Sequence, residues 1–520
     1  MRRSRLPFGA LMTGAVVTAL VLVSTGSGLG QQSDRAATRV LTPSPVPAIN
    51  TGLLLEATDV QRLRETAVAD GQYDTHPRFV PDQVIVKFTD ASQGLASRGA
   101  AALGVGAVDV DYPAFGDFAV LALQTGADPL AVSDTLNERS DVEYAQPDYV
   151  RQPLFVPNDP FFHLQWNLTQ VGVERAWDGN MGGTDAITVA VIDSGLAFED
   201  AVIEFEAGAF TQDGRDYPAL GTINVPFAAA FDLVSPNRID QPFDFVWMDE
   251  HPVDLDGHGT HVTGTLGQLT NNAEGVAGVA FNVRLMPLKV LIGEWDFIFG
   301  GASMCCGAAD SDIAAAIRYA AERGADVINM SLGGPDPSPV VDEAIRFAVG
   351  LDVFVAIAGG NSFEDGNPAI WPAAAAEDID GAVAVGGVDR NSNRAFYSST
   401  GSYIEIVAPG GDQRTDGFDG VLQQTPHPEF ALTFFEPPSQ FGPPRFDVMA
   451  YAFFQGTSMA SPHVAGLAAL LKSRGVSDPR VIEAAMKITA TDLGEPGRDD
   501  EYGSGLVNMA RALRGLGLAR

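Results

Sequence analysis

Short apolar runs alternate with amphipathic segments from about residue 158 to the end of the chain. The segments 311–323 and 459–473 have helical spacing, whereas the apolar runs between them have the length and composition of buried strands. Uninterrupted apolar strands separated by helices are typical of a parallel sheet covered on both faces. The pattern predicts an α/β fold with strands at Ile187–Ile192, Leu285–Leu291, Asp326–Met330, Val353–Ala358 and Ala382–Val385.

A smaller pattern lies between residues 81 and 150. Strand-like runs at 84–88, 118–123 and 142–145 are separated by helix-prone segments at 96–103 and 129–139. This order predicts a small α+β domain of the ferredoxin-like type.

The first 30 residues have the pattern of a secretory signal peptide. Arginines at positions 2, 3 and 5 precede an apolar run at 10–23, and small residues follow at 24–30. The run is short for a membrane span, so export is expected, with an uncleaved anchor as the alternative. No later apolar stretch is long enough to cross a bilayer, and residues 31–80, rich in Pro, Ser, Thr and Ala, are expected to form a linker or pro-segment.

The composition of the chain limits the classes of molecule that it is expected to bind. The 520 residues include 46% hydrophobic and 19% charged residues, which is typical of a globular protein large enough for two or three domains. The net charge of −34 argues against nucleic acid as a partner, because phosphate binding requires clustered Lys and Arg. An acidic surface suits a salt-rich or calcium-containing medium, or is simply a solvated face.

The two cysteines, Cys305 and Cys306, are sequence neighbours. They cannot form a disulfide framework, so we expect free thiols or an unusual bridge between adjacent residues in a surface loop.

Three short segments contain the groups that a serine hydrolase needs. Asp193 ends a predicted strand, His258 lies in His-Gly-Thr-His, and Ser458 lies in Gly-Thr-Ser-Met-Ala. A serine hydroxyl becomes a nucleophile when a histidine accepts its proton, and a carboxylate holds that histidine in the required tautomer. The chain order Asp, His, Ser excludes the orders of α/β-hydrolases and of chymotrypsin-like proteases.

Each member has another interpretation when taken alone. Ser458 could be only the N-cap of the helix that follows it. His258 and His261, with Asp254 and Asp256 nearby, could bind a metal, although no His-Glu-x-x-His arrangement accompanies them.

Asn361 follows the predicted strand 353–358 and could merely form a turn. Acyl transfer also requires donors where the carbonyl oxygen becomes negative. The Asn361 amide and the Ser458 backbone N–H could supply such an oxyanion hole.

Four segments together resemble the subtilases, the subtilisin-like serine proteases of the peptidase S8 family, and the resemblance extends over residues 80–515. They stand in the family's order at Val189–Gly195, Asp256–Val262, Asn329–Gly334 and Gly456–Gly466.

The resemblance implies a role for each site residue. Asp193 orients His258, His258 is the general base and acid, Ser458 is the nucleophile, and Asn361 completes the oxyanion hole. The substrate backbone would pair with an edge strand, and a second wall would enclose the side chain before the cut bond, with Ile370 near its base. The first wall is Ser331, Leu332 and Gly333, and the second is Ala358, Gly359 and Gly360.

The segment 270–276 resembles the family's calcium loop. The expected ligands are Asn272 and the carbonyl oxygens of Thr270, Glu274 and Val276, since calcium prefers oxygen donors. A simple turn is the alternative. The aspartate that completes such sites cannot be placed, because residues 196–250 form an insertion that is atypical of the family.

The region 81–150 resembles an inhibitor I9-like propeptide, which templates folding and then blocks the cleft. We expect self-cleavage between 149 and 158, ahead of a catalytic domain at 155–515. A second long insertion, 411–450, is rich in Phe and Pro. Both insertions could border the cleft or decorate the surface.

The leading hypothesis is a secreted, monomeric serine endopeptidase that acts on protein or peptide substrates and is inhibited by its own propeptide. No nucleic acid partner and no membrane span after signal removal are expected. The alternatives are a non-catalytic binding protein that keeps the fold, and an esterase.

Overall fold

The computed structural model divides the chain into two compact units. One combines residues 1–54 with 155–520, and the other consists of residues 55–154. The described residues are 40–43, 49–53, 79–89, 104–113, 116–149, 155–178, 182–212, 215–217, 219, 221–300, 306–414, 416–428 and 444–515. The expected signal peptide and the predicted helix at 96–103 lie outside these residues.

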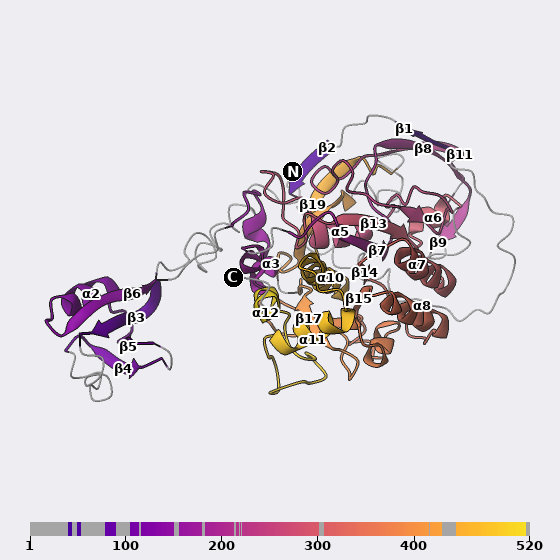
Figure 1. Ribbon diagram of the computed structural model, residues 1–520. Coiled ribbons are helices and arrows are strands. Elements are labelled where there is room, and N and C mark those ends of the chain that lie inside the picture. The colour runs from indigo at the N-terminus through magenta and orange to yellow at the C-terminus, as the bar shows by residue number, and fades with distance from the viewer. Residues whose placement is uncertain are drawn as a thin grey trace, which may run out of the picture. The chain divides into compact units, whose positions relative to one another are not determined.

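A seven-stranded, entirely parallel sheet forms the centre of the larger unit (Figure 1). The predicted α/β architecture is confirmed, and each strand expected from the apolar runs lies within three residues of its expected bounds. In spatial order the strands are β12 (Phe243–Asp244), β13 (Arg284–Lys289), β7 (Thr188–Asp193), β14 (Val327–Met330), β15 (Phe354–Ala358), β16 (Ala382–Val388) and β17 (Ile406–Pro409).

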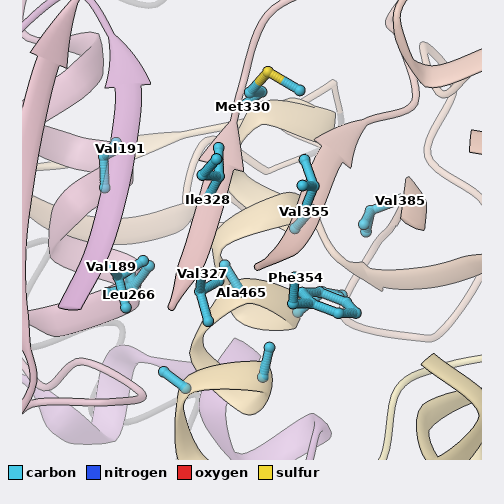
Figure 2. Packing of buried hydrophobic residues seen from close by; sticks show 14 of the residues in the cluster. Val189, Val191, Leu266, Val327, Ile328, Met330, Phe354, Val355, Val385 and Ala465 are labelled. Atoms are coloured by element: carbon cyan, nitrogen blue, oxygen red, sulfur yellow. The ribbon is translucent and has the colours of Figure 1, made fainter. Parts of the chain in front are cut away.

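Two pairs of helices pack against this sheet. Helix α5 (His258–Gly267) contacts α10 (Thr457–Ser473), and α7 (Asp310–Glu322) contacts α8 (Pro339–Gly350). Figure 2 shows Val189 of β7 beside Leu266 of α5, and Val327 of β14 beside Ala465 of α10. The strands are buried almost throughout, which explains their uninterrupted apolar sequences. The other helices are α3 (Trp166–Gln170), α4 (Val173–Trp177), α6 (Glu294–Ile298), α11 (Pro479–Thr489), α12 (Met509–Gly515) and the 3₁₀ turns at Phe162–Leu164 and Ala373–Asp378.

The insertion at 196–250 builds a second, smaller sheet. Strand β8 (Ala201–Ala207) lies between β11 (Gly221–Phe227) and β1 (Val40–Pro43), and a hairpin of β9 (Phe210–Gln212) and β10 (Arg215–Tyr217) follows β8. Its inner face forms a separate apolar cluster in which the Phe205 and Phe299 rings stack at 4.1 Å between centroids.

The second insertion meets the first in this cluster. The Phe446 and Phe227 rings stack at 5.1 Å between centroids. The two insertions therefore stabilise each other with a shared core.

A third sheet consists of β18 (Val421–Pro426), β19 (Val448–Phe454) and β2 (Ile49–Leu53). Strands β1 and β2 belong to the segment that was expected to be a linker. Pairing with strands about 160 and 400 residues away gives it regular structure that its own Pro-rich sequence does not predict.

The smaller unit is a four-stranded antiparallel sheet in the order β4-β5-β3-β6, as in ferredoxin-like folds. Its elements are β3 (Phe79–Phe88), β4 (Ala107–Asp111), β5 (Ala119–Leu123), α2 (Pro129–Asn137) and β6 (Val142–Tyr149). Strand β4 was not predicted, because none of its five side chains is fully buried and its sequence gives no apolar run. Within the described ranges, none of the helices is long and apolar enough to cross a membrane.

Candidate active site

The predicted site residues lie where the parallel strands end. Asp193 is the last residue of β7, His258 is the first residue of α5, and Ser458 is the second residue of α10. Asn361 follows the end of β15 by three residues. The carboxyl ends of parallel strands share one edge, so residues distant in sequence meet there.

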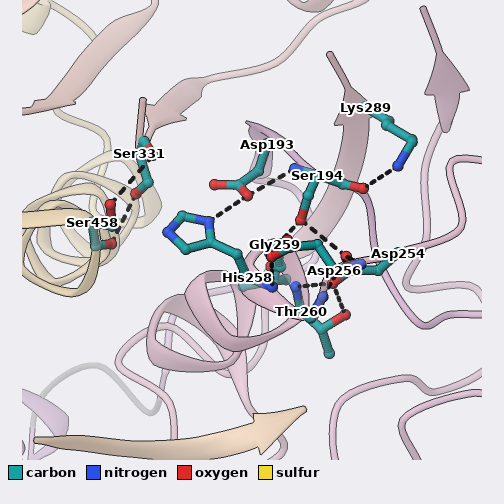
Figure 3. Close-up of polar contacts among 12 residues, drawn as sticks. Asp193, Ser194, Asp254, Asp256, His258, Gly259, Thr260, Lys289, Ser331 and Ser458 are labelled. Carbon is teal, nitrogen blue, oxygen red and sulfur yellow. Dashed lines mark hydrogen bonds and ion pairs between the residues drawn. The ribbon is translucent and has the colours of Figure 1, made fainter. Parts of the chain in front are cut away.

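Asp193 and His258 form the central contact of the site. His258 Nδ1–H donates to Asp193 Oδ1 at 2.7 Å, and the carboxylate is buried (Figure 3). The same oxygen accepts the Ser194 backbone N–H at 2.7 Å. The hydrogen bond from His258 Nδ1–H to Asp193 fixes the tautomer that leaves Nε2 of the neutral ring as a proton acceptor.

Asp254 fastens the end of β7 to the start of α5. Its carboxylate accepts hydrogen bonds from the Thr260 N–H and hydroxyl and from the Gly257 N–H. The Asp254 carboxylate thereby caps the start of α5. It also accepts the Ser194 hydroxyl at 2.9 Å, and Ser194 Oγ accepts the Gly259 N–H at 2.8 Å.

Gly259 is required by this close approach. A Cβ on Gly259 would lie 2.3 Å from the carbonyl oxygen of Gly195, closer than any side chain can come. The Gly in His-Gly-Thr-His is thus a packing requirement of the Asp193–His258 contact.

A buried ion pair contacts the loop that follows β7. Lys289 and Asp296 are both fully buried, with Nζ 2.9 Å from the carboxylate, and Nζ also donates to the Ser194 carbonyl at 2.7 Å (Figure 3). A buried charge needs such partners, because unpaired it would be costly.

Burial alone would lower the pKa of His258. The Asp193 carboxylate, with smaller contributions from Asp256 and Asp254, outweighs burial and raises the pKa of His258 to about 9. The ring is therefore an unusually strong base for a histidine.

The His258 ring lies between Asp193 and Ser458 (Figure 3). Ser458 Oγ is 3.4 Å from the Ser331 carbonyl oxygen, and among the described residues no hydrogen bond joins it to His258. Behind it, Ser331 Oγ donates to the Ser458 carbonyl and Ser461 Oγ donates to Asn329. This network fixes the first turn of α10.

Asn361 is oriented by Thr457. Asn361 Oδ1 accepts both the Thr457 N–H and its hydroxyl at 2.9 Å, which leaves the amide Nδ2 as a donor. Within the described residues, neither this Nδ2 nor the Ser458 backbone N–H has an acceptor.

The two donors converge on one place. A Cβ built on Gly456 would lie 3.4 Å from Asn361 Nδ2 and 3.6 Å from the Ser458 nitrogen. The φ of Gly456 is 146°, which also favours glycine. Together these donors form a site for a negatively charged oxygen.

The segment 331–333, expected to pair with substrate, has unpaired backbone groups. Among the described residues, the N–H and C=O groups of Leu332 and Gly333 form no hydrogen bonds, while Ser331 is tied to Ser458. Such an edge can pair with an extended peptide.

The opposite wall is held by two hydrogen bonds from backbone N–H groups. The Gly359 N–H donates to Val385 O at 2.8 Å, and the Gly360 N–H donates to Thr457 Oγ1 at 3.1 Å. Ile370 lies between the walls, since a Cβ on either Gly333 or Gly360 would come within 2.7 Å of its side chain.

Comparison with known proteins now decides the family. A model described as the subtilase family matches residues 184–505, which is more than half of the chain. The chain belongs to the subtilase family. It is 32% identical over 374 residues to the thermophilic serine proteinase of Bacillus sp. strain AK1, covering 72% of this chain and 73% of that one. It is 38% identical over 352 residues to subtilisin Savinase of Lederbergia lenta, covering 68% and 99%.

A solved structure shares the fold. Fervidolysin from Fervidobacterium pennivorans, described as a keratinolytic enzyme related to subtilisin, has a TM-score of 0.50 and 22% identity, covering 85% of this chain and 62% of that one. A model of the fervidolysin N-terminal prodomain matches residues 68–148. The chain is therefore a subtilisin-like serine protease with an N-terminal prodomain. The I9 label for this prodomain stays a prediction.

The structure places an aspartate of the 196–250 insertion at the expected calcium loop of this subtilase. Asp232 accepts hydrogen bonds from the Asn272 amide, the Val276 N–H and the Tyr451 hydroxyl. Sequence reasoning missed it, because the length of the insertion hides which of its aspartates returns to the loop. Asp159 also reaches the loop, by accepting the Asn271 N–H at 2.7 Å.

The buried His261 ring contacts β18 and β19. Its Nε2 lies 3.1 Å and 3.0 Å from the carbonyl oxygens of Val421 and Ala452, and its ring stacks on Phe454. Burial lowers the pKa of His261 to about 3, so it is neutral and donates from Nε2. It therefore serves packing, and His258 and His261 do not form a pair of metal ligands through these nitrogens.

The second insertion contacts the start of α5. The Thr425 hydroxyl of β18 donates to the Gly257 carbonyl at 2.8 Å, just before His258. This part of the insertion therefore packs against the helix that carries His258. Cys306 is disulfide-bonded, and Cys305 lies outside the described residues.

The charge of Asp256 supports a test of the His258 environment. In a Ser458→Ala background, NMR titration of the His258 ring should give a midpoint well above 6.5, toward about 9. Asp256→Asn removes one carboxylate and should lower that midpoint by roughly half a pH unit. Asp336→Asn, in an exposed loop, should leave it unchanged. Equal midpoints in the Asp256→Asn variant and its parent would contradict the electrostatic explanation.

Proposed function

We propose that this subtilase is a secreted, monomeric serine endopeptidase in which Asp193, His258 and Ser458 form the catalytic triad. The observation that carries the proposal is the 2.7 Å contact between His258 Nδ1 and Asp193, with the ring directed toward Ser458. The signal-like pattern of residues 1–30 supports export.

In this mechanism, Ser458 Oγ attacks the peptide carbonyl carbon while His258 Nε2 accepts its proton. Asp193 stabilises the imidazolium that forms, and the tetrahedral oxyanion accepts hydrogen bonds from Asn361 Nδ2 and the Ser458 N–H. His258 then gives the proton to the leaving amine. Water, deprotonated by His258, hydrolyses the acyl-enzyme and regenerates the hydroxyl.

The substrate is an extended peptide. The unpaired backbone groups of Leu332 and Gly333 support main-chain pairing with a peptide, and an ester gains little from them. The pocket between Ser331–Gly333 and Ala358–Gly360 receives the side chain before the cut bond.

The prodomain makes the enzyme a precursor. We propose that the chain cuts itself between 149 and 158, where β6 ends at Tyr149 and the larger unit begins at Phe155. The prodomain then acts as an intramolecular inhibitor.

We further propose that the loop at 270–276 holds one calcium ion, which would be structural. Thr270, Asn272, Glu274 and Val276 would supply oxygens, joined by the Asp232 carboxylate and by Asp159. Asp159 Oδ1 is buried and has no partner among the described residues, and burial raises the pKa of Asp232 to about 7, which marks a carboxylate without a counter-charge. These oxygen donors fit calcium. No three His, Cys, Asp or Glu side chains of the described chain gather as a metal site, so backbone carbonyls are required.

Labelling with a fluorophosphonate tests the nucleophile. Processed protein should be modified at Ser458, whereas Ser458→Ala should remain an uncut precursor without label or peptidase activity. Ser473→Ala, which removes a hydroxyl at the far end of the same helix, should behave as the parent. Processed but unlabelled parent protein would identify a non-catalytic binding protein instead.

Chelation tests the calcium proposal. In a Ser458→Ala background, calcium at 100 times its Kd should stabilise the protein by about 2.7 kcal/mol, seen as a rise in Tm that a chelator reverses. Asp232→Asn should greatly reduce this rise and Asp336→Asn should preserve it. A Tm independent of calcium in the parent would overturn the proposal.

A further inference from the structure

Two strands that precede the prodomain in sequence belong to the catalytic unit. Residues 55–154 form a unit of their own, whereas β1 and β2 lie with residues 155–520. The chain thus leaves the catalytic unit after Leu54, forms the prodomain, and returns at Phe155.

Strand β1 closes one edge of the insertion sheet. Val40–Pro43 pair antiparallel with Ala201–Glu204 of β8, whose other edge is paired with β11. The side chains of Ala201 and Ile203 in this part of β8 are fully buried in the cluster shared by the two insertions. Without β1, a well-packed strand would have an open edge of unpaired backbone groups.

Strand β2 braces the strand that leads to the nucleophile. Ile49 to Leu53 pair parallel with Val448 to Tyr451 of β19, and β19 ends at Phe454, four residues before Ser458. Tyr451 of the same strand donates to Asp232, and the Ala452 carbonyl accepts from His261. The pairing therefore acts on a strand that positions several parts of the site.

Cleavage between 149 and 158 breaks only one of two connections. It separates the prodomain from Phe155, but the prodomain stays covalently joined to β1 and β2 through residues 54–78. We propose that β1 and β2 form a clamp that keeps the cleaved N-terminal fragment bound to the catalytic unit. The clamp's regulatory meaning rests on the proposed self-processing.

The clamp determines how the prodomain is released from the catalytic unit. A prodomain that stays covalently tethered to the clamp experiences an effective concentration in roughly the millimolar range, so the first cut alone does not release it. Release requires a second cut between 54 and 79, after which β1 and β2 remain on the mature enzyme as part of its fold.

The clamp is tested on the full chain carrying Ser458→Ala, with site-specific protease sequences placed at 150–154 and at 60–66. Cutting at both sites frees the prodomain from the clamp peptide, and size-exclusion chromatography with intact mass analysis locates each piece. The peptide that contains residues 40–53 should elute with the catalytic unit. Its elution at its own small size would overturn the proposal.

A proline variant supplies the matched comparison. Leu41, Thr42, Asn50 and Thr51 are each changed to Pro, so that in each strand one of two adjacent residues loses an N–H directed at its partner. The clamp peptide should then be lost from the catalytic-unit fraction. Ser44→Pro with Val46→Pro, between the two strands, should retain it.

Hydrogen exchange separates loss of the clamp from loss of the fold. In the uncut proline variant, amides of β8 and β19 should lose protection while those of β7 and β14 keep it. A variant that fails to fold does not rescue the proposal, because elution of the unsubstituted clamp peptide decides it alone. Since both cuts are supplied from outside, the result is independent of whether the enzyme processes itself.

Discussion

The contact between Asp193 and His258 depends on a fully buried carboxylate at the end of a buried strand. Asp193 is fully buried, and its second oxygen has no partner among the described residues. A buried charge of this kind is tolerated only where the surrounding structure supplies hydrogen-bond donors. The Ser194 N–H and the His258 Nδ1–H are the donors here.

Much of the neighbouring structure serves to keep that geometry. Asp254 joins the loop after β7 to the first turn of α5, and Lys289 holds the same loop through the Ser194 carbonyl. On the other side, Thr457 orients Asn361 and Ser331 fixes the first turn of α10. The site is preorganised because each reactive group is held by a residue that does not react.

The sequence predicts those parts of the structure that local patterns encode. The buried strands have apolar runs that can be recognised without knowledge of their tertiary contacts. The ends of β7 and β15 place Asp193 and Asn361 at a shared edge of the sheet. Asp232 and Thr457 were not assigned roles, and Asp254 was considered only as a possible metal ligand, because the partners of these residues are found only after folding. The positions of β1 and β2 could not be predicted either, because nothing in a Pro-rich segment indicates which distant strand edge it will pair with.

The two insertions contact both the helix that carries His258 and the N-terminal strands. They share an aromatic cluster, border the start of α5 through Thr425, and supply edges on which the N-terminal strands lie. In the proposed mechanism, catalysis and precursor control would use neighbouring strands, because β2 of the N-terminal segment pairs with β19, the strand that precedes Ser458.

The central claim is that Asp193 acts through His258 to activate Ser458. The most direct measurement is kcat for a peptide amide substrate with the parent and with Asp193→Asn, each fully processed by an added protease and compared with Asp336→Asn. The account predicts a loss of roughly 10⁴-fold in kcat for Asp193→Asn, because the amide holds the ring in the wrong tautomer. It predicts no change for the control. A loss of less than about tenfold in a folded, processed Asp193→Asn enzyme would contradict it.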